Sequence, residues 1–325
     1  MTFQQSLFLF IVKKYHGYDH GYVSSGLIQS ARFVVDMLNE RGIAAKLVEA
    51  VDGNSIDALV DQNRPTRVVI EALWATPEKL AELQRLWPRV KWTVRVHSET
   101  PFQAQEGQAV GWIKKYFRQG IQVAFNSSVT VSDFEVVGTP VWLPNYYPMG
   151  AVRPKKLQGR FFNVGCFGAI RPLKNQLIQA LAAVRYRGRI AKPLLFHMNG
   201  NRTEQYGDNN LKNIQALLGD QLVLHPWMKH GDFLRLVAEM DIVLAVSLSE
   251  SFCITAADAV SLGVPLVGSK AIAWLPERSQ APVDSAAGIA EAMNRAGKVS
   301  AFFNREHLAR YLKDSVRVWK KWSER

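Results

Sequence analysis

The chain has 325 residues, of which 48% are hydrophobic and 21% charged. This composition is typical of a globular protein and excludes an intrinsically disordered chain. No apolar run in the sequence approaches the roughly 20 residues that cross a bilayer. The first apolar segment has no basic region before it and ends at Lys13 and Lys14. These features favour a β-strand over a signal peptide, and we expect a cytoplasmic protein.

The net charge of +12 belongs almost entirely to the second half, because residues 1–150 carry +1 and the rest of the chain +11. The stretch from Arg153 to Lys192 holds ten basic residues and no acidic one. Such one-sided charge indicates an anionic partner, which would be a nucleotide diphosphate, a nucleic acid or an anionic membrane surface. A solvated basic face that aids solubility is the alternative.

The two cysteines, Cys166 and Cys253, are far apart in apolar stretches, and the sequence has no Cys-x-x-Cys motif or Cys/His cluster. This pattern predicts buried reduced thiols and no structural zinc.

The first half alternates between strand and helix patterns. A continuous apolar run at residues 6–12 is typical of a parallel strand covered on both faces, and residues 27–41 have the spacing of an amphipathic helix. Further strands are expected at residues 45–51, 68–73, 92–96 and 123–125, and a further helix at 77–86. Residues 141–160 contain three prolines and four basic residues, which indicates an interdomain linker.

The second half repeats the alternation, with expected strands at residues 161–167, 193–198, 222–224, 242–246 and 265–268. Helices are expected at residues 175–186, 211–218, 233–240, 256–262 and, as a basic terminal helix, 305–322. Repeated βα units predict an α/β fold of two Rossmann-like domains with parallel sheets, at residues 1–150 and 151–325. Ligands bind at the carboxyl ends of such strands, so we expect the two domains to face each other across a cleft.

Residues 247–269 carry the strongest chemical signal. They place a polar loop between the strand at 242–246 and a helix that opens at 252–254, and a helix N-terminus suits a diphosphate. Glu250 lies in the loop and Asp258 two turns down the helix. Both carboxylates can accept hydrogen bonds from sugar and ribose hydroxyls.

This stretch resembles the E-x7-E region of the retaining GT-B glycosyltransferases, the group 1 type, which reads S-x-x-E-G-F-G before its second carboxylate. Glu250, Phe252, Ala259, Gly263 and Pro265 match, whereas Ser251 and Cys253 replace glycines and Asp258 replaces the second glutamate. The resemblance implies that Glu250 holds the donor sugar and Asp258 the ribose. It also implies that Ser251, Phe252, Cys253 and Ile254 line the donor phosphates at the helix start.

A second segment, residues 163–180, resembles the V-G-R-x4-K motif of the same family. Gly168 and Lys174 fit its spacing, while Ala169 occupies the arginine position and Arg171 is the expected substitute. Arg and Lys stabilise a departing nucleoside diphosphate without a metal; an ordinary basic loop is the alternative. Trp227 and Met228 lie in the loop that, by resemblance, meets the nucleotide base.

In the first half, the family resemblance implies that His97, which follows a strand, reaches the donor sugar as a catalytic residue beside Glu250. A strand-end histidine with structural partners is the alternative. The first loop, residues 14–26, contains three glycines and three potentially metal-ligating side chains but no metal-site spacing. We expect it to face the acceptor, with no metal required: His16, Gly17, Asp19, His20 and Gly21.

The resemblance implies transfer of a sugar from a UDP-sugar with retention of configuration, and no cofactor besides that donor. Three acceptor classes stay open, in this order: DNA carrying hydroxymethylated pyrimidines, a lipid-linked or surface glycan reached from a membrane, and a soluble metabolite or protein. The basic stretch favours DNA, with Tyr146, Tyr147 and Trp227 stacking an extruded base. The terminal helix with Trp319 and Trp322 favours a membrane. A non-catalytic, anion-binding GT-B scaffold is the alternative to an enzyme, and the oligomeric state is left open.

Overall fold

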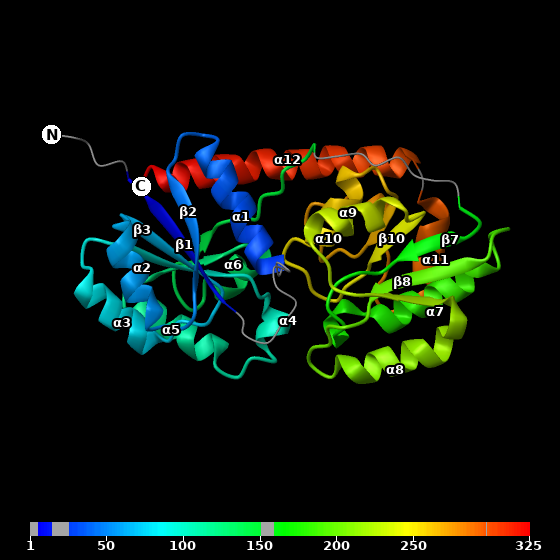
Figure 1. Cartoon of the computed structure of the whole chain (residues 1–325), viewed down its shortest axis with the longest axis horizontal. Helices are drawn as coiled ribbons and strands as arrows, with labels where there is room; N and C mark the ends of the chain where they lie inside the picture. The colour runs from blue at the N-terminus through cyan, green and yellow to red at the C-terminus, as the bar shows by residue number, and fades with distance from the viewer. Residues whose placement is uncertain (1–5, 15–25, 151–158, 297) are drawn as a thin grey trace. The chain divides into compact units, whose positions relative to one another are not determined.

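The computed structural model describes residues 6–14, 26–150, 159–296 and 298–325 (Figure 1). The chain divides into two compact units. Unit 1 consists of Met1–Pro148 and Leu312–Arg325, and unit 2 of Met149–Tyr311. Each unit is built on one sheet in which all described strand pairs are parallel. The predicted α/β class with two parallel sheets is therefore confirmed.

Sheet A of unit 1 has the strand order β2-β1-β3-β4-β5-β6. Strands β1, β3 and β4 are buried along most of their length, as expected where helices cover both faces of a parallel sheet. The chain moves away from β1 in both directions, so the order reverses between β1 and β3. The strands are β1 (Phe8–Lys13), β2 (Ala45–Ala50), β3 (Arg67–Glu71), β4 (Lys91–Val96), β5 (Gln122–Phe125) and β6 (Val141–Trp142).

The helices of unit 1 follow their sequence signals. Helix α1 buries Ala31, Val34 and Leu38 on one face, and α3 begins where the Thr76 hydroxyl accepts from the Lys79 N–H at 3.1 Å, a normal N-cap. The helices are α1 (Gly26–Asn39), α2 (Ser55–Asn63), α3 (Pro77–Leu86), α4 (Thr100–Gln103), α5 (Ala109–Arg118) and α6 (Ser128–Phe134).

Sheet B of unit 2 has the order β11-β10-β7-β8-β9. Its strands are β7 (Phe162–Gly165), β8 (Leu194–Asn199), β9 (Leu222–His225), β10 (Ile242–Ala245) and β11 (Leu266–Gly268). Neighbouring helices are α7 (Gln176–Arg187), α8 (Gly207–Leu218) and α11 (Ala286–Arg295) in one group and α9 (His230–Ala238) and α10 (Ile254–Ser261) in another. Three short 3₁₀ turns are η1 (Pro172–Lys174), η2 (Gly219–Gln221) and η3 (Glu277–Ser279).

Helix α12 (Lys298–Ser323) begins in unit 2 and ends in unit 1. In unit 1, Trp319 and Trp322 are buried and contact Phe10 and Phe8 of strand β1. Because these two indoles complete the core of unit 1, Leu312–Arg325 pack there, whereas the sequence-based division placed them in the second domain. No helix among the described residues is long and apolar enough to cross a membrane.

The predicted linker at residues 141–160 also differs from the structure at its start. Val141–Trp142 form strand β6, and Leu143, Asn145 and Tyr147 are buried in unit 1. Residues 151–158 of the predicted linker lie outside the described part of the chain.

Candidate functional site

Strands β7 and β10 are neighbours in sheet B, and the strand order reverses between them. In open α/β sheets, ligands usually bind at the carboxyl ends of the strands where the strand order reverses. The loop after β7 contains Gly168, Arg171 and Lys174, and the loop after β10 contains Ser247 and Glu250. Both sequence motifs thus meet at one place, and we call these five residues the switch-point cluster.

An ion pair between Lys174 Nζ and Glu250 Oε1 joins the two loops. The Ser247 hydroxyl donates to the same carboxylate oxygen at 2.8 Å. A backbone bond from Leu248 N to Leu173 O, at 2.9 Å, holds the loops together beside the pair. The Glu250 side chain is only 8% exposed and that of Lys174 16%, so water screens their attraction weakly.

The electrostatics of the pair follow from its burial. Burial alone would raise the pKa of Glu250, but the Lys174 ammonium group outweighs this and holds that pKa below its ordinary value. Burial likewise opposes the charged form of Lys174, yet the Glu250 carboxylate raises the lysine pKa above its ordinary value. Both groups are therefore charged at neutral pH, and the cluster offers a buried ammonium group and a buried carboxylate side by side.

Arg171 and Gly168 extend the cluster along the loop after β7. Arg171 Nη1 lies 3.1 Å from Glu204 Oε2, and Arg202 pairs with the other oxygen of Glu204 at 2.7 Å. Gly168 has a φ of +117°, a conformation that L side chains rarely adopt, and a Cβ there would lie 3.7 Å from Lys174 Cε. The 3.7 Å contact would be an ordinary one, so the positive φ and not the lysine stem is the reason for glycine here.

Cys253 is the residue just before helix α10, and its φ of +63° is left-handed. The motif that this stretch resembles has glycine at this position, which such a backbone favours. The Cys253 side chain is buried beside Glu250, and burial, followed by the Glu250 charge, raises the pKa of its thiol to about 12. The backbone bend is thus the one the motif requires, with a neutral thiol added beside the cluster.

Asp258 on α10 is 1% exposed and accepts a hydrogen bond from His230 Nε2 at 2.8 Å. Burial would lower the pKa of His230, but the hydrogen bond and the charge of Asp258 raise it above its ordinary value. No local pattern identifies His230, because 28 residues separate the two partners and only the packing of α9 on α10 brings them together.

The loop between β9 and α9 places Trp227 against two residues of the loop after β8. Trp227 N donates to Asn201 Oδ1 at 2.8 Å, and the Arg202 guanidinium lies 4.8 Å from the Trp227 ring centroid. The indole is therefore half-buried with a cation on it. Met228, the next residue, is half-buried as well.

His97 belongs to unit 1, at the end of β4, and both of its ring nitrogens have partners there. Nε2 contacts the Glu71 carboxylate, and the Asn126 amide donates to Nδ1 at 3.3 Å. Burial and the Arg95 charge lower the pKa of His97, with Glu71 opposing them. The ring is therefore neutral, carries its proton on Nε2 and donates it to Glu71.

The Glu71 carboxylate that contacts His97 is itself held in place by other residues. Glu71 and Arg95 are register partners on β3 and β4, both are fully buried, and Arg95 Nη1 lies 3.1 Å from Glu71 Oε2. Arg95 also donates to Leu143 O at 2.9 Å and to Asn145 Oδ1. Sequence reasoning missed this network, although charged residues at the ends of apolar strands were its signal.

The structure therefore unites only part of the expected site. Gly168, Arg171, Lys174, Glu250 and Cys253 lie together, with Ser251, Phe252 and Ile254 beside them at the start of α10. His97 belongs to the other unit. The expected acceptor-side residues His16, Gly17, Asp19, His20 and Gly21 lie outside the described residues. Sequence reasoning also left out Ser247, whose signal was the first position of the S-x-x-E pattern.

Several aromatic side chains that were expected to contact DNA or a membrane are buried. Tyr147 is 2% exposed and packs against Phe33, so it cannot stack an extruded base without unfolding its neighbourhood. Trp319 and Trp322 are 0% and 4% exposed, so they cannot serve as membrane anchors in this structure. The aromatic arguments for DNA and for a membrane fail at these three residues.

The basic stretch from Arg153 to Lys192 is divided by the fold. Arg171 and Lys174 belong to the switch-point cluster at the carboxyl edge of sheet B. Five other members lie before β7, in the last turn of α7 or between α7 and β8, at the amino edge of the sheet: Arg160, Arg185, Arg187, Arg189 and Lys192. Lys192 Nζ donates to Gly159 O at 2.9 Å, which ties the two parts of this amino-edge group together.

Among the described residues, no group of three or more His, Cys, Asp or Glu side chains is placed to hold a metal ion. The chemistry that the described site offers is therefore that of buried charges, hydroxyls and a helix N-terminus.

Comparison with known proteins connects this geometry to a family. A family model described as Glycosyl transferases group 1 matches residues 162–298, which lie within unit 2. No curated protein sequence matches the chain.

Solved structures resemble both units together. HepE from Anabaena, in complex with UDP and glucose, has a TM-score of 0.68 at 13% identity, with 98% of each chain covered. Sucrose-phosphate synthase from Thermosynechococcus elongatus has a TM-score of 0.71 at 13% identity, covering 97% of this chain and 98% of that one. The N-terminal domain of Candida albicans trehalose-6-phosphate phosphatase has 0.69 at 8% identity, covering 98% and 96%. The chain has the GT-B fold.

Proposed function

We propose that this protein is a glycosyltransferase that moves a sugar from a UDP-sugar to an acceptor hydroxyl. The observation that carries the proposal is the Lys174–Glu250 ion pair at the strand-order reversal of sheet B. The match of residues 162–298 to a glycosyltransferase family supports it, as does the fold shared with a HepE structure that holds UDP and glucose.

In the proposed mechanism, the donor replaces each partner of the ion pair. The diphosphate takes the Lys174 ammonium group, with Arg171 beside it, and a donor-sugar hydroxyl donates to the Glu250 carboxylate. Negative charge grows on the diphosphate as the glycosidic bond breaks, and two fixed cations stabilise that charge most in the transition state. The Lys174 and Arg171 charges thus fill the role of a metal ion, and we propose that transfer is metal-independent.

Recognition of the nucleoside falls to the remaining expected residues. Asp258, held by His230, accepts from ribose hydroxyls, and the Trp227–Met228 loop meets the base. The N–H groups at the start of α10, from Ser251 to Ile254, donate to the phosphates.

We further propose retention of configuration, on the resemblance of the two motifs to retaining enzymes. The bond from the anomeric carbon to the diphosphate oxygen breaks, and a bond to the acceptor oxygen forms on the same face. The acceptor proton passes to the departing diphosphate. His97, neutral and held by Glu71, acts in this proposal as a hydrogen-bonding group and not as a base.

For the acceptor we propose DNA with hydroxymethylated pyrimidines first and a lipid-linked or surface glycan second. The net charge of +12 supports DNA. Five of the basic residues behind that argument are at the amino edge of sheet B, so only Arg171 and Lys174 of the described stretch contribute positive charge at the site.

The test offers the protein a panel of UDP-sugars together with DNA that contains hydroxymethylcytosine, and the digested nucleosides are weighed by mass spectrometry. A gain of one sugar mass on hydroxymethylcytidine establishes donor, acceptor and reaction together. UDP release without a mass gain would still support a glycosyltransferase, and glycans would then be tested as acceptors. Absence of both, with every UDP-sugar, refutes the proposal and leaves an anion-binding scaffold.

A further inference from the structure

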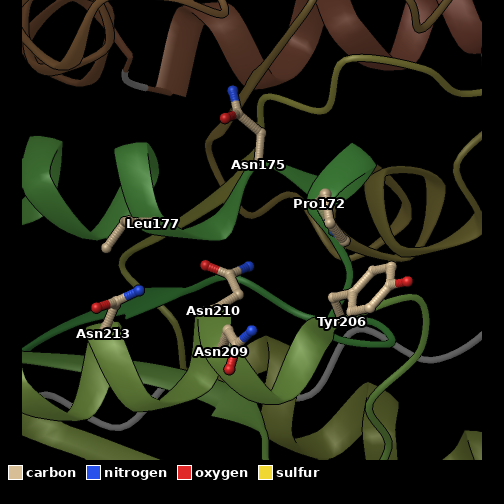
Figure 2. Close-up of a pocket in the computed structure, with 7 residues that line it drawn as sticks. All are labelled: Pro172, Asn175, Leu177, Tyr206, Asn209, Asn210 and Asn213. Atoms are coloured by element: carbon tan, nitrogen blue, oxygen red, sulfur yellow. The ribbon is translucent and has the colours of Figure 1, made fainter.

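Unit 2 has a pocket of about 330 Å³ whose lining includes neither Lys174 nor Glu250. Figure 2 shows the lining side chains: some come from η1 and the start of α7, and the others from the first two turns of α8. Helices α7 and α8 pack against each other. The pocket lies between their N-terminal ends. The volume is at the lower end of the range for small-molecule sites.

The lining is uncharged and rich in amides. Its polar members are Asn175, Asn209, Asn210, Asn213 and Tyr206. Asn209, Asn210 and Asn213 have the spacing of residues on one side of α8, and Tyr206 is the residue just before that helix. The amides of Asn209 and Asn213 each offer two donors and a carbonyl acceptor, a combination that matches a hydroxyl, which also both donates and accepts.

Tyr206 adds an apolar surface to this polar lining. Its side chain is 85% exposed, and an aromatic face of this kind packs against C–H groups. Its position is set by the backbone: Gln205 and Tyr206 both have positive φ, at 49° and 67°. The next residue, Gly207, fits so closely that a Cβ would lie 1.9 Å from Ile170 O. The backbone that carries the ring is therefore held beside the pocket by the turn that begins α8.

The pocket and the proposed donor site share one turn. Pro172 and Asn175 line the pocket, while Lys174 between them reaches Glu250. Asn175 Nδ2 donates to Val246 O at 3.1 Å and Val283 O at 2.7 Å, and Asn210 Nδ2 donates to Gln176 Oε1 at 3.1 Å. The turn is thus fixed from both sides, and the carbonyl oxygens of these two amides are left as acceptors for a ligand.

We propose that this pocket is a second saccharide-binding site, separate from the donor site at the switch-point cluster. Neutral sugar rings present adjacent hydroxyls on their edges and C–H groups on their faces, which the four amides and Tyr206 match. An anion would find no cationic side chain in the lining, since none of the described lining residues is charged. A nucleobase would also stack on Tyr206 and bond to amides, and it is the competing occupant that the experiment excludes.

The experiment uses the full-length protein labelled with ¹⁵N in its asparagine side chains, and the NH₂ signals of Asn209 and Asn213 are assigned from single Ala variants. Glucose, galactose, mannose, N-acetylglucosamine, maltose and, as the competing class, adenosine are titrated separately. At least one saccharide should shift both signals in the presence of saturating UDP. Adenosine should leave them unchanged.

Three variants separate the pocket from its surroundings. Asn209→Ala/Asn213→Ala and Tyr206→Ala should each weaken saccharide binding about tenfold, the loss expected for one or two hydrogen bonds or a stacked ring. Gln215→Ala removes an exposed amide elsewhere on α8 and should leave the affinity unchanged. Lys174→Ala, which should abolish donor turnover, should retain saccharide binding.

Measuring both saccharide binding and donor turnover on the wild-type protein separates failure of this proposal from failure of the proposed function. Saccharide binding without donor turnover in any UDP-sugar would support the pocket and refute the transferase. Turnover with no saccharide shifting Asn209 and Asn213 would support the transferase and overturn the pocket. Shifts by adenosine alone, or full displacement of the saccharide by UDP, would also overturn the pocket.

Discussion

Lys174 and Glu250 form an ion pair although 76 residues separate them in sequence. The pair connects the loops after two adjacent strands, β7 and β10, at the one place in sheet B where the chain reverses its strand order. The strand order thus brings two motifs that are distant in sequence into one site. Because both charges are buried, the pair should affect the stability of the protein as well as ligand binding.

Removing one partner of this pair should destabilise unit 2. Glu250→Gln leaves the Lys174 charge buried without its partner, and the expected loss in free energy of unfolding is about 3 kcal/mol. The double variant Glu250→Gln/Lys174→Met removes the stranded charge and should be more stable than Glu250→Gln alone. Urea unfolding followed by circular dichroism measures both. Equal stabilities of the single and double variants would show that the pair is not coupled in solution.

Cys253 should tolerate glycine better than alanine. Alanine removes the buried thiol but keeps the cost of a left-handed φ, whereas glycine removes both, so Cys253→Gly should be more stable than Cys253→Ala by about 1 kcal/mol. Thermal unfolding of the two variants checks the order. In an ordinary helical position the order is reversed, and finding it reversed here would contradict the left-handed backbone at this residue.

Both cysteines should be unreactive in the native protein. Cys166 and Cys253 are buried, and burial raises the pKa of each thiol to about 12, so almost no thiolate forms near pH 8. Iodoacetamide should therefore modify neither residue until denaturant is added, as followed by intact-mass spectrometry. Rapid labelling without denaturant would place at least one thiol at an accessible, polar position.

The His230–Asp258 pair should stabilise unit 2 more at low pH than at high pH. The hydrogen bond to Asp258 raises the pKa of His230 above its unfolded value despite burial. The contribution is therefore complete below the unfolded pKa of about 6.5 and is lost as pH rises through the higher folded value. The stability difference between wild type and His230→Gln should shrink from pH 5.5 to pH 9, both chosen to bracket that range.

A difference that stays constant or grows across that range would mean that His230 is neutral in the folded protein. In Asp258→Asn the charge that raises the His230 pKa is absent and burial lowers that pKa, so the stability difference between wild type and Asp258→Asn should also shrink as the pH rises.

Trp319 should be essential to unit 1. Its indole N–H donates to Pro144 O at 2.8 Å, and the Arg95 guanidinium lies 5.2 Å from its ring centroid. Trp319→Ala should cost about 3–5 kcal/mol, as measured by urea unfolding. Phe302→Ala, at an exposed position of the same helix, should change stability by less than about 0.5 kcal/mol. Similar losses in the two variants would contradict the packing of the helix end on unit 1.

Much of the fold could be predicted because a parallel strand that is covered on both faces has a continuous apolar sequence. The strands β1, β3, β4, β7 and β10 carry this signal, and helix α3 carries an N-cap and a proline at its start. Helix α5, by contrast, was missed, although its buried residues Ala109, Ile113 and Tyr116 have helical spacing. Strand β6 has only two residues, too few for any periodicity.

The candidate site could be predicted where its residues belong to one of the two sequence motifs, each of which lies on one loop. Glu250, Lys174 and Gly168 followed from spacing and resemblance. His230 and Glu71 did not, because each is fixed by a partner 26 or 28 residues away through packing and strand register. The position of the basic residues also depends on the topology of sheet B. Helix α7 runs back to the amino edge of the sheet and places Arg185 and Arg187 there. Counting charges along the sequence does not reveal this.

The most direct test of the central claim is the release of UDP from UDP-sugars by the purified protein, its Glu250→Gln variant and the matched Glu277→Gln variant, whose glutamate is exposed. The account predicts release by wild type and Glu277→Gln with at least one UDP-sugar. For Glu250→Gln, once shown to be folded, it predicts a rate reduced about a hundredfold. Equal rates in all three proteins, or no release from any UDP-sugar, would contradict a sugar-donor site at the switch-point cluster.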